Sequence, residues 1–273
     1  MNPMPKAMAS EAEASGLCSR AAAGETRFAD GTVQPISWQL PEEVPVALQI
    51  NSEPYAVMMA TPADLRDFAI GFMIAEGLIA SARDIQGVLV MPVDGGTTVD
   101  VAIAPEALDA SRMVKRAIEG RTGCGLCGVE DIASAVRPLN RLVRTGAPDT
   151  AAVLRAAKAL PDKQLMNRLN RTVHGAAYAS ADGDILLVRE DVGRHTALDK
   201  LIGALAQKAI DPSAGFVVMT SRCSFELVQK SVSAGITALI TVSAPTVLAL
   251  ELAEKSNLFL AALGAGGVAV FNP

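Results

Sequence analysis

The chain has 273 residues, of which half are hydrophobic, so it is long enough to bury one large core or two modest ones. Its formal net charge is −5, and aromatic residues make up 4 % of it. Dedicated nucleic-acid-binding proteins are usually basic and stack bases on aromatic side chains, so the composition argues against that class. Four cysteines are too few for a disulfide scaffold, and we expect a protein of a reducing compartment, the cytoplasm.

The first residues and one long apolar stretch bear on targeting. Residues 1–30 are rich in Ala, Ser, Glu and Gly without periodicity, which predicts a mobile tail. They lack a basic segment followed by an apolar one, so no signal peptide is expected. Residues 234–253 are apolar, but Thr, Ser, Pro and Glu interrupt them. We interpret this stretch as a buried strand, a turn and a helix, and we expect no membrane association.

Residues 31–119 are predicted to form a small α+β domain. Residues 44–51 and 54–61 have the composition of two hairpin strands, and a second hairpin is expected to turn at the glycines that follow Asp94. A helix is predicted between the two hairpins, with Thr61 as its N-cap and the next residue, a proline, in its first turn. Its apolar residues repeat at helical spacing, so one face should pack on the hairpins.

Residues 129–273 alternate predicted strands and helices. The expected helices cover residues 196–209, 224–235 and 246–257. Thr196 and Asp199 are spaced like a capping box at the start of the first of these helices. Such alternation is typical of an α/β fold with a parallel or mixed sheet covered by helices.

Three of the predicted strand-to-helix loops are polar, namely residues 193–196, 221–224 and 243–246. Ligands bind beyond the carboxyl ends of strands in such sheets, and helix N-termini attract anions there. Arg194 and Arg222 add positive charge, so a phosphate-bearing ligand suits these loops. Ordinary helix capping with solvated arginines explains the same residues equally well. The acid, base and imidazole groups of residues 190–195 are interpreted as an ion-pair turn in preference to a catalytic cluster.

Residues 120–128 are predicted to be a flexible loop between the two domains, and they hold a Cys-x-x-Cys pair. Cys124 and Cys127 stand among three glycines, which leave the sulfur atoms uncovered. Arg121 is close in sequence, and positive charge lowers the pKa of a thiol and raises its thiolate fraction. The loop is therefore suited to a nucleophilic sulfur.

Four interpretations of the cysteine pair compete. A structural zinc ion needs four ligands, and the chain has no second Cys-x-x-Cys to complete the set. Zinc deaminase chemistry needs a His-x-Glu sequence, which neither His174 nor His195 begins. A thioredoxin-like dithiol would open a helix early in a βαβ unit, whereas this pair follows a predicted helix. The fourth interpretation is a persulfide carrier, whose thiolate accepts a sulfane sulfur and passes it on. The residues alone leave all four open.

Several long motifs, in order and after residue 40, resemble those of the FdhD family. They are EEVPVAL, MMATPADLRDFAIGFMIAEGLI, GRTGCGLCGVE, EDVGRHTALDKLIG, TSRCSFELVQKS and AEKSNLFLA. The resemblance implies an α/β fold in which a C-terminal mixed-sheet domain of cytidine-deaminase-like type joins a smaller N-terminal α+β domain.

The resemblance also implies a function. Members of this family are sulfurtransferases that take persulfide sulfur from an IscS-type cysteine desulfurase and pass it to the bis-molybdopterin guanine dinucleotide form of the molybdenum cofactor, which formate dehydrogenase requires. Cys124 corresponds to the cysteine that carries the persulfide, and Cys127 is expected to relay the sulfur or assist its release. The resemblance further implies a homodimer with no metal of its own. The alternative is a chaperone that binds the cofactor without sulfur transfer, with the cysteine pair holding zinc or a structural disulfide.

The family's cofactor-binding segment near the C-terminus corresponds to Leu263, Gly264, Ala265, Gly266, Gly267 and Val268. These residues carry no charge, so pairing with cofactor phosphates is expected from Arg194, Arg222 and Lys230, beside His195 and Ser221. Cys223 departs from the family's usual residue, and we expect it to be a small buried hydrophobe.

Overall fold

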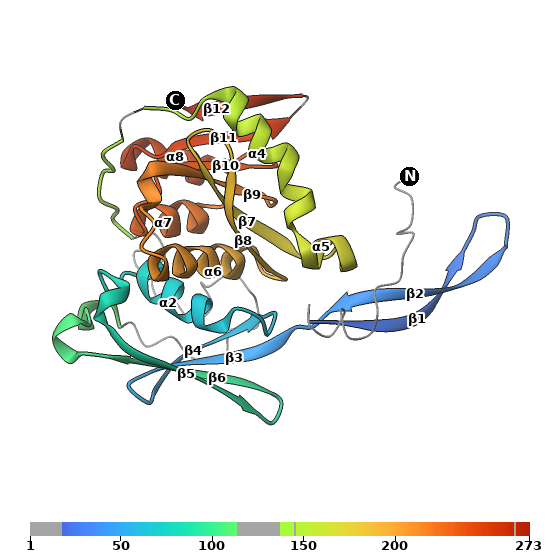
Figure 1. Ribbon diagram of the computed structural model, residues 1–273, viewed down its shortest axis with the longest axis horizontal. Coiled ribbons are helices and arrows are strands. Elements are labelled where there is room, and N and C mark those ends of the chain that lie inside the picture. The colour runs from blue at the N-terminus through green and yellow to red at the C-terminus, as the bar shows by residue number, and fades with distance from the viewer. Residues whose placement is uncertain (1–17, 114–136, 145, 265) are drawn as a thin grey trace.

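The computed structural model describes residues 18–113, 137–144, 146–264 and 266–273. Two β-sheets lie on opposite sides of a pair of crossing helices, and a third, two-stranded ribbon projects from the body (Figure 1). No helix in the described part of the chain is long and apolar enough to cross a membrane.

The projecting ribbon corrects the predicted N-terminal tail. It pairs β1 (Ser19–Arg27) with β2 (Val33–Pro41) in antiparallel register, so residues 19–27 are a strand and not a mobile segment. The short side chains of β1 conceal its strand character, because β2 supplies the large apolar groups of the ribbon. Asn170 holds the base of the ribbon: its side-chain amide donates to Ser19 Oγ over 3.1 Å, and its carbonyl oxygen accepts from the Trp38 indole over 3.4 Å.

The N-terminal sheet consists of the two predicted hairpins, which are confirmed. Its strands are β3 (Val44–Ile50), β4 (Glu53–Ala60), β5 (Ile85–Val93) and β6 (Gly96–Ile103). Their order is β4-β3-β6-β5, with the central pair parallel and each hairpin antiparallel. Helix α2 (Leu65–Ala75) covers one face of this sheet, where alternate strand residues such as Leu48 and Val99 are buried.

The start of α2 differs from the sequence prediction. The N-cap is Asp64, which has a left-handed backbone conformation, and Thr61 lies outside the helix. The backbone N–H of Thr61 donates to Asp191 over 3.0 Å, and its hydroxyl accepts from the backbone N–H of Val192 over 3.2 Å. Thr61 therefore joins the N-terminal sheet region to the C-terminal domain instead of capping a helix.

The C-terminal sheet is a mixed sheet, which confirms the α/β prediction. Its strands are β7 (His174–Ser180), β8 (Ile185–Asp191), β9 (Gly215–Met219), β10 (Ala238–Thr241), β11 (Phe259–Gly264) and β12 (Gly267–Asn272). They lie in the order β12-β11-β10-β9-β7-β8. The three central strands β9, β10 and β11 are parallel, and the outer pairings are antiparallel.

Helices cover both faces of this sheet. One face packs on α6 (Arg194–Gln207), α7 (Phe225–Ser233) and α8 (Val247–Ser256), and the other packs on α4 (Thr150–Lys163), next to α5 (Leu165–Asn170). Val217 and Met219 point into the first core, and Phe216 and Val218 point into the second. The continuous apolar runs in these strands are explained by burial on both faces. Short 3₁₀ helices η1 (Ala82–Asp84), η2 (Pro105–Ala107), η3 (Ala110–Arg112) and η4 (Pro212–Ala214) occur in the connections.

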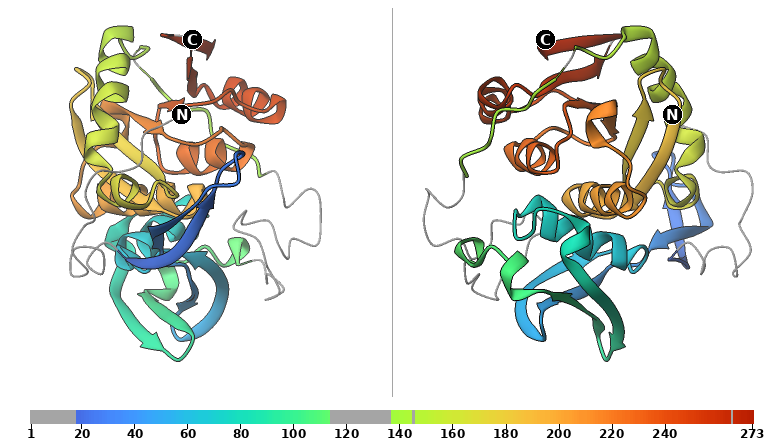
Figure 2. Two further views of the ribbon diagram at one scale, coloured as in Figure 1. Left: turned by 90° about the vertical axis from the view of Figure 1, so that its right-hand side faces the viewer. Right: turned by 60° about the vertical axis from the view of Figure 1, so that its left-hand side comes forward.

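Helices α2 and α6 cross closely and join the two sheets into one body (Figure 2). Both helices have a glycine at the crossing. A Cβ atom on Gly71 would lie 1.7 Å from the carbonyl oxygen of Asp199, and one on Gly203 would lie 1.9 Å from that of Asp67. Glycine is needed at both positions because the backbones themselves are in contact.

Candidate functional site

The polar loops singled out in the sequence meet at one edge of the C-terminal sheet. Strand register places Met219 beside Thr241 and Thr241 beside Ala262, so β9 and β10 end level with each other, and β11 continues to Gly264 at the same edge. Because β7 runs antiparallel to β9, it begins at this edge, and β8 ends there, with His174 paired to Asp191. We call this the carboxyl edge. It contains the loops before α6, α7 and α8 and the glycine turn between β11 and β12.

Hydrogen bonds tie the neighbouring loops of the carboxyl edge together. The hydroxyl of Thr220 accepts from the backbone N–H of Gly175 over 2.8 Å, and the Thr220 N–H donates to the Gly175 carbonyl over 3.0 Å. Cys223 forms an isolated parallel bridge with Pro245, and the Thr246 N–H donates to the Cys223 carbonyl over 3.1 Å. The loops before α7 and α8 are therefore held rigidly side by side.

The loop before α7 contains one exposed charge and two buried side chains. Ser221 is buried and its hydroxyl donates to the Arg222 carbonyl oxygen over 3.0 Å, whereas the Arg222 side chain is exposed. Cys223 is fully buried, and burial raises the pKa of its thiol to about 12. This confirms the expectation of a small buried hydrophobe, because a thiol of that pKa is neutral and unreactive at physiological pH.

The two histidines lie at the start of β7 and of α6. His195 is buried, and its Nε2 lies 3.3 Å from Ser224 Oγ and 3.4 Å from Glu226 Oε2. Burial acts to raise the pKa of Glu226, but hydrogen bonds from His195 and Ser224 outweigh it and lower that pKa, so the carboxylate stays ionised. Burial, together with the positive charge of Arg194 and His195, lowers the pKa of His174, so its ring is neutral at physiological pH.

The acidic residues that precede α6, Glu190 and Asp191, bond to other groups of the protein. Glu190 accepts hydrogen bonds from the backbone N–H groups of Met166 and Asn167, each over 2.8 Å, at the start of α5. Asp191 is fully buried and lies 2.6 Å from Lys200 Nζ. Both acidic side chains of residues 190–195 therefore have partners within the fold, and of this group the half-buried Arg194 is a charged side chain that remains partly accessible to a ligand.

Two sequence predictions about α6 and α7 are wrong. Gly193 is the N-cap of α6 and provides no side-chain bond, so Thr196 and Asp199 form no capping box. Asp199 is fully buried and accepts two hydrogen bonds from Lys230 Nζ, each over 2.9 Å. Lys230 also donates to Glu76 at the end of α2 over 3.2 Å. Lys230 is thus buried between two carboxylates and cannot pair with a ligand phosphate.

Cys124 and Cys127 lie outside the described residues, as do all of residues 114–136. The described chain ends at Met113 and begins again at Arg137, which is firmly held. The backbone N–H of Arg137 donates to Gln229 Oε1 over 2.7 Å, and its guanidinium donates to the Glu76 carbonyl oxygen. Arg137, the first described residue after the cysteine pair, is therefore anchored to α7 and to the end of α2, the two helices that also hold the buried Lys230–Glu76 pair.

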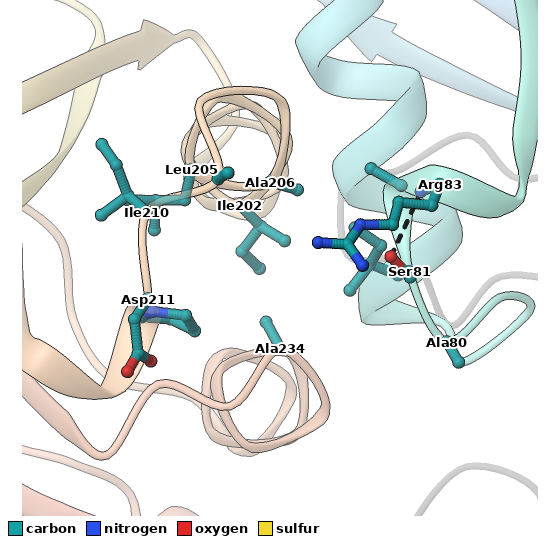
Figure 3. Close-up of a pocket in the computed structure, with 13 residues that line it drawn as sticks. Ala80, Ser81, Arg83, Ile202, Leu205, Ala206, Ile210, Asp211 and Ala234 are labelled. Carbon is teal, nitrogen blue, oxygen red and sulfur yellow. Dashed lines mark hydrogen bonds between the residues drawn. The ribbon is translucent and has the colours of Figure 1, made fainter.

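Two pockets lie away from the carboxyl edge. One, of about 330 Å³, is mostly apolar and lies between the C-terminal half of α6, the end of α7 and η1 (Figure 3). In Figure 3 Ile202 and Leu205 approach it from α6, and Arg83 extends over it from the opposite wall. The other, of about 340 Å³, is lined by Arg112 and Arg137, which stand on either side of the undescribed segment. Neither pocket includes a residue that the sequence singled out for cofactor binding.

The predicted C-terminal binding segment forms the β11–β12 turn at the carboxyl edge. Gly264 pairs with Gly267, and Gly266 has a φ of 82°, a value that glycine adopts without strain. Leu263 and Val268 are half-buried, and Ala265 lies outside the described residues. Strands β9 and β10 separate this turn from β7, so three strand spacings of about 4.8 Å place it roughly 14 Å from His174.

The described residues contain no group of three or more His, Cys, Asp or Glu side chains arranged to hold a metal ion.

Comparison with known proteins identifies the family. The model of the FdhD/NarQ family matches residues 41–270, which is most of the chain. The chain belongs to this family. The match begins at the end of β2, so the projecting ribbon precedes it.

Individual relatives agree with this assignment. The chain is 47 % identical to the sulfur carrier protein FdhD of Variovorax paradoxus over 219 residues, which is 80 % of this chain and 79 % of the relative. It is 44 % identical to the protein of the same name from Agrobacterium fabrum over 243 residues, which is 88 % of this chain and 89 % of the relative.

A solved structure supports the fold. The crystal structure of a candidate formate dehydrogenase accessory protein from Desulfotalea psychrophila superimposes with a TM-score of 0.73 and covers 94 % of this chain and 97 % of its own. The two sequences are 23 % identical, so this comparison bears on the mixed α/β fold alone.

Proposed function

We propose that the protein is a sulfur carrier that serves formate dehydrogenase. The observation that carries the proposal is the similarity, over about four-fifths of the chain, to family members named sulfur carrier protein FdhD. The Cys-x-x-Cys pair of this chain, Cys124 and Cys127, supplies the thiols that such a role requires.

Cys124 is the proposed acceptor of sulfur. Its thiolate attacks the outer sulfur of a persulfide on an IscS-type cysteine desulfurase, as in thiol–disulfide exchange. The new S–S bond forms on Cys124 while the donor's S–S bond breaks, and the donor cysteine leaves as a thiolate. The protein is in this sense a sulfurtransferase.

Cys127 is the proposed assistant in the release of sulfur. Delivery of the outer sulfur as sulfide requires two electrons. The Cys127 thiolate can supply them by attacking the inner sulfur of Cys124, which releases hydrosulfide and leaves a Cys124–Cys127 disulfide. Thiols of a reducing compartment, the cytoplasm in this proposal, return the pair to the reduced state.

The carboxyl edge is the proposed site for the substrate that receives the sulfur, the bis-molybdopterin guanine dinucleotide form of the molybdenum cofactor. Arg194 and the exposed Arg222 offer guanidinium groups suited to phosphate, and the N-termini of α6, α7 and α8 open onto the same edge. The glycine turn at 264–267 offers backbone N–H groups without side chains in the way. Buried His195 and Ser221 support these loops from within.

Further parts of the proposal rest on the family resemblance. They are a homodimeric assembly, a direct encounter with formate dehydrogenase, and a C-terminal domain of cytidine-deaminase-like type.

The test is mass spectrometry of the protein after incubation with a cysteine desulfurase and cysteine. We expect the peptide with Cys124 to gain about 32 Da, the mass of one sulfur atom, in the wild type and in Cys223→Ala, and to gain nothing in Cys124→Ala. Activation of formate dehydrogenase should be lost in parallel. A Cys124→Ala protein that still activates the enzyme contradicts the proposal. Stoichiometric zinc that is lost when both Cys124 and Cys127 are replaced favours the cofactor-binding chaperone instead.

A further inference from the structure

The apolar pocket between α6, the end of α7 and η1 has no part in the proposed function. Its volume of about 330 Å³ equals that of about eleven water molecules at roughly 30 Å³ each. Both halves of the chain contribute walls: Ile74 and residues 80–83 form one side, and α6, residues 209–212 and Ala234 form the other (Figure 3). Small-molecule sites occur preferentially between domains, in cavities of about 300–1,000 Å³. The pocket therefore has the position and the size of a site for a small ligand.

The side of the pocket formed by the C-terminal domain is aliphatic. Ile202 and Leu205 border it from α6, and each retains only 3 % of its accessible surface. Ile210 and Ala234 lie beside them and belong to the same hydrophobic core. None of the described residues that line the pocket is aromatic. A hydrocarbon chain placed here would extend the hydrophobic core of the C-terminal domain, and its burial is favourable.

The helix ends beside the pocket are capped by backbone hydrogen bonds. At the end of α6, the N–H groups of Ala209 and Ile210 donate to the carbonyl oxygens of Ala206 and Leu205, over 3.2 and 3.0 Å. At the end of α7, the N–H of Ala234 donates to a carbonyl oxygen of the last helical turn over 3.1 Å. Because these carbonyl oxygens already have donors, the helix ends are poor partners for a cationic ligand.

The charged groups around the pocket leave one guanidinium facing it. The Asp211 carboxylate accepts from the backbone N–H and the hydroxyl of Ser213, over 2.9 and 2.7 Å, and Figure 3 shows it turned away from the cavity. Asp84 accepts from the backbone N–H of Ser81 over 2.9 Å. Arg83 extends over the pocket, and its guanidinium has no hydrogen bond or ion pair within the described parts of the chain. This guanidinium is therefore available to an anion.

We propose that the pocket binds a small monocarboxylic acid with an aliphatic chain, of about the size of octanoate. The carboxylate accepts charge-assisted hydrogen bonds from the Arg83 guanidinium. The Ser81 hydroxyl oxygen accepts from the Arg83 backbone N–H over 3.2 Å, so its proton remains to be donated to the same carboxylate. The chain lies against Ile202 and Leu205. A ligand of about ten non-hydrogen atoms suits a volume of about eleven water molecules.

Such a ligand joins the two halves of the molecule. Its carboxylate is held by η1, which follows α2, and its chain is held by α6 and the end of α7. The complete pocket exists only when the two halves are folded against each other. A ligand that binds the native state and not the unfolded chain raises the melting temperature.

Isothermal titration calorimetry of the full-length protein with octanoate tests the proposal. We expect a Kd of about 0.1–1 mM, as is usual for a ligand this small. Octylamine has the same chain with a positive head, and acetate has the same head without the chain. Each should bind at least about tenfold more weakly than octanoate.

Two substitutions test the two parts of the site. Arg83→Gln should weaken octanoate binding at least about tenfold, whereas Arg20→Gln, which replaces an exposed arginine on β1, should leave it unchanged. Ala234→Leu fills the cavity from the end of α7, where Figure 3 shows the alanine methyl group facing it, and should abolish binding.

Circular dichroism melting curves without ligand show that each variant is folded. Octanoate at about ten times its Kd should raise the melting temperature of the wild type and of Arg20→Gln by a few degrees, and that of Arg83→Gln by less. A wild type that does not bind octanoate overturns the proposal. So does octylamine that binds as tightly, or full octanoate affinity in Arg83→Gln. None of these measurements involves sulfur transfer, so their outcome is independent of the proposed function.

Discussion

The helix layer between the two sheets and the carboxyl edge of the C-terminal sheet use charged side chains in opposite ways. In the helix layer, Lys230 lies buried between Asp199 and Glu76, and each charge is satisfied by protein groups. At the carboxyl edge, the Arg222 side chain is exposed and Arg194 is half-exposed. The difference shows that the partner of a charge, more than its position in a motif, decides whether it stabilises the fold or is available to a ligand.

The largest effect is expected from breaking the buried network. Lys230→Met keeps the length of the side chain but leaves the buried Asp199 carboxylate without a counter-charge and removes one of the two cations that pair with Glu76, the other being Arg137. The loss should cost about 3–5 kcal/mol of the free energy of unfolding. Urea denaturation followed by circular dichroism measures it. Lys200→Met is the matched variant, because Lys200 is also fully buried beside a carboxylate, Asp191, and a similar loss is expected. If both variants lose less than about 1 kcal/mol of the free energy of unfolding, the buried charges of the helix layer do not stabilise the fold as stated.

The second effect concerns pH. Burial raises the pKa of Asp199 from 3.8 to about 6, although Lys230 acts to lower it. The native state therefore holds a proton more tightly than the unfolded chain, so the stability contributed by this group is complete below pH 3.8 and is lost as the pH rises through about 6. Asp199→Asn should remove a slope of about 1.4 kcal/mol per pH unit from that interval.

Denaturant titrations of the wild type and Asp199→Asn between about pH 4 and pH 7 measure the difference in slope. Burial also raises the pKa values of Glu190 and Asp191, but these groups titrate in both proteins and cancel in the comparison. Parallel pH profiles for the two proteins would show that Asp199 has an ordinary pKa.

Replacing the arginines of the carboxyl edge should weaken ligand binding and leave the stability of the fold almost unchanged. Arg194→Ala and Arg222→Ala should each weaken the binding of guanosine diphosphate, used as a probe for the dinucleotide arms of the proposed substrate, by about tenfold. The free energy of unfolding should change by less than about 0.5 kcal/mol. Isothermal titration calorimetry measures the affinity. Arg155→Ala on α4 is the control, because Arg155 bonds the Asp182 carbonyl at the other end of the sheet. If all three variants weaken the binding of guanosine diphosphate equally, the carboxyl edge is not its binding site.

The smallest effect is expected at Cys223. Cys223→Ala removes one buried sulfur atom and should cost about 1 kcal/mol or slightly more. Persulfide formation should be unchanged, because a thiol with a pKa of about 12 is not ionised under assay conditions. In the folded double variant Cys124→Ala, Cys127→Ala, the remaining thiols are those of Cys18 and Cys223. Iodoacetamide at neutral pH should modify Cys18 and spare Cys223. Rapid modification of Cys223 would show that its loop opens.

Local patterns account for the parts of the fold that were predicted correctly. Both N-terminal hairpins and the strand–helix alternation of the C-terminal domain follow from periodicity and turn residues, which act between near neighbours. The strand β1 was missed because its short side chains show no pattern until β2 is paired with it. Thr61 has the sequence context of an N-cap, but a distant carboxylate, Asp191, binds its backbone N–H instead.

For the candidate site, the sequence by itself determined which loops are polar, the small hydrophobic character of Cys223, and the presence of a Cys-x-x-Cys pair, because these depend on residue type and local order. Only the tertiary structure decided which charges remain free. Lys230 and Arg222 stand eight positions apart in one motif, yet one is buried between carboxylates and the other is exposed. The reason is physical: the free energy of a charge depends on its desolvation and its partners, and those partners come from helices that are distant in the chain.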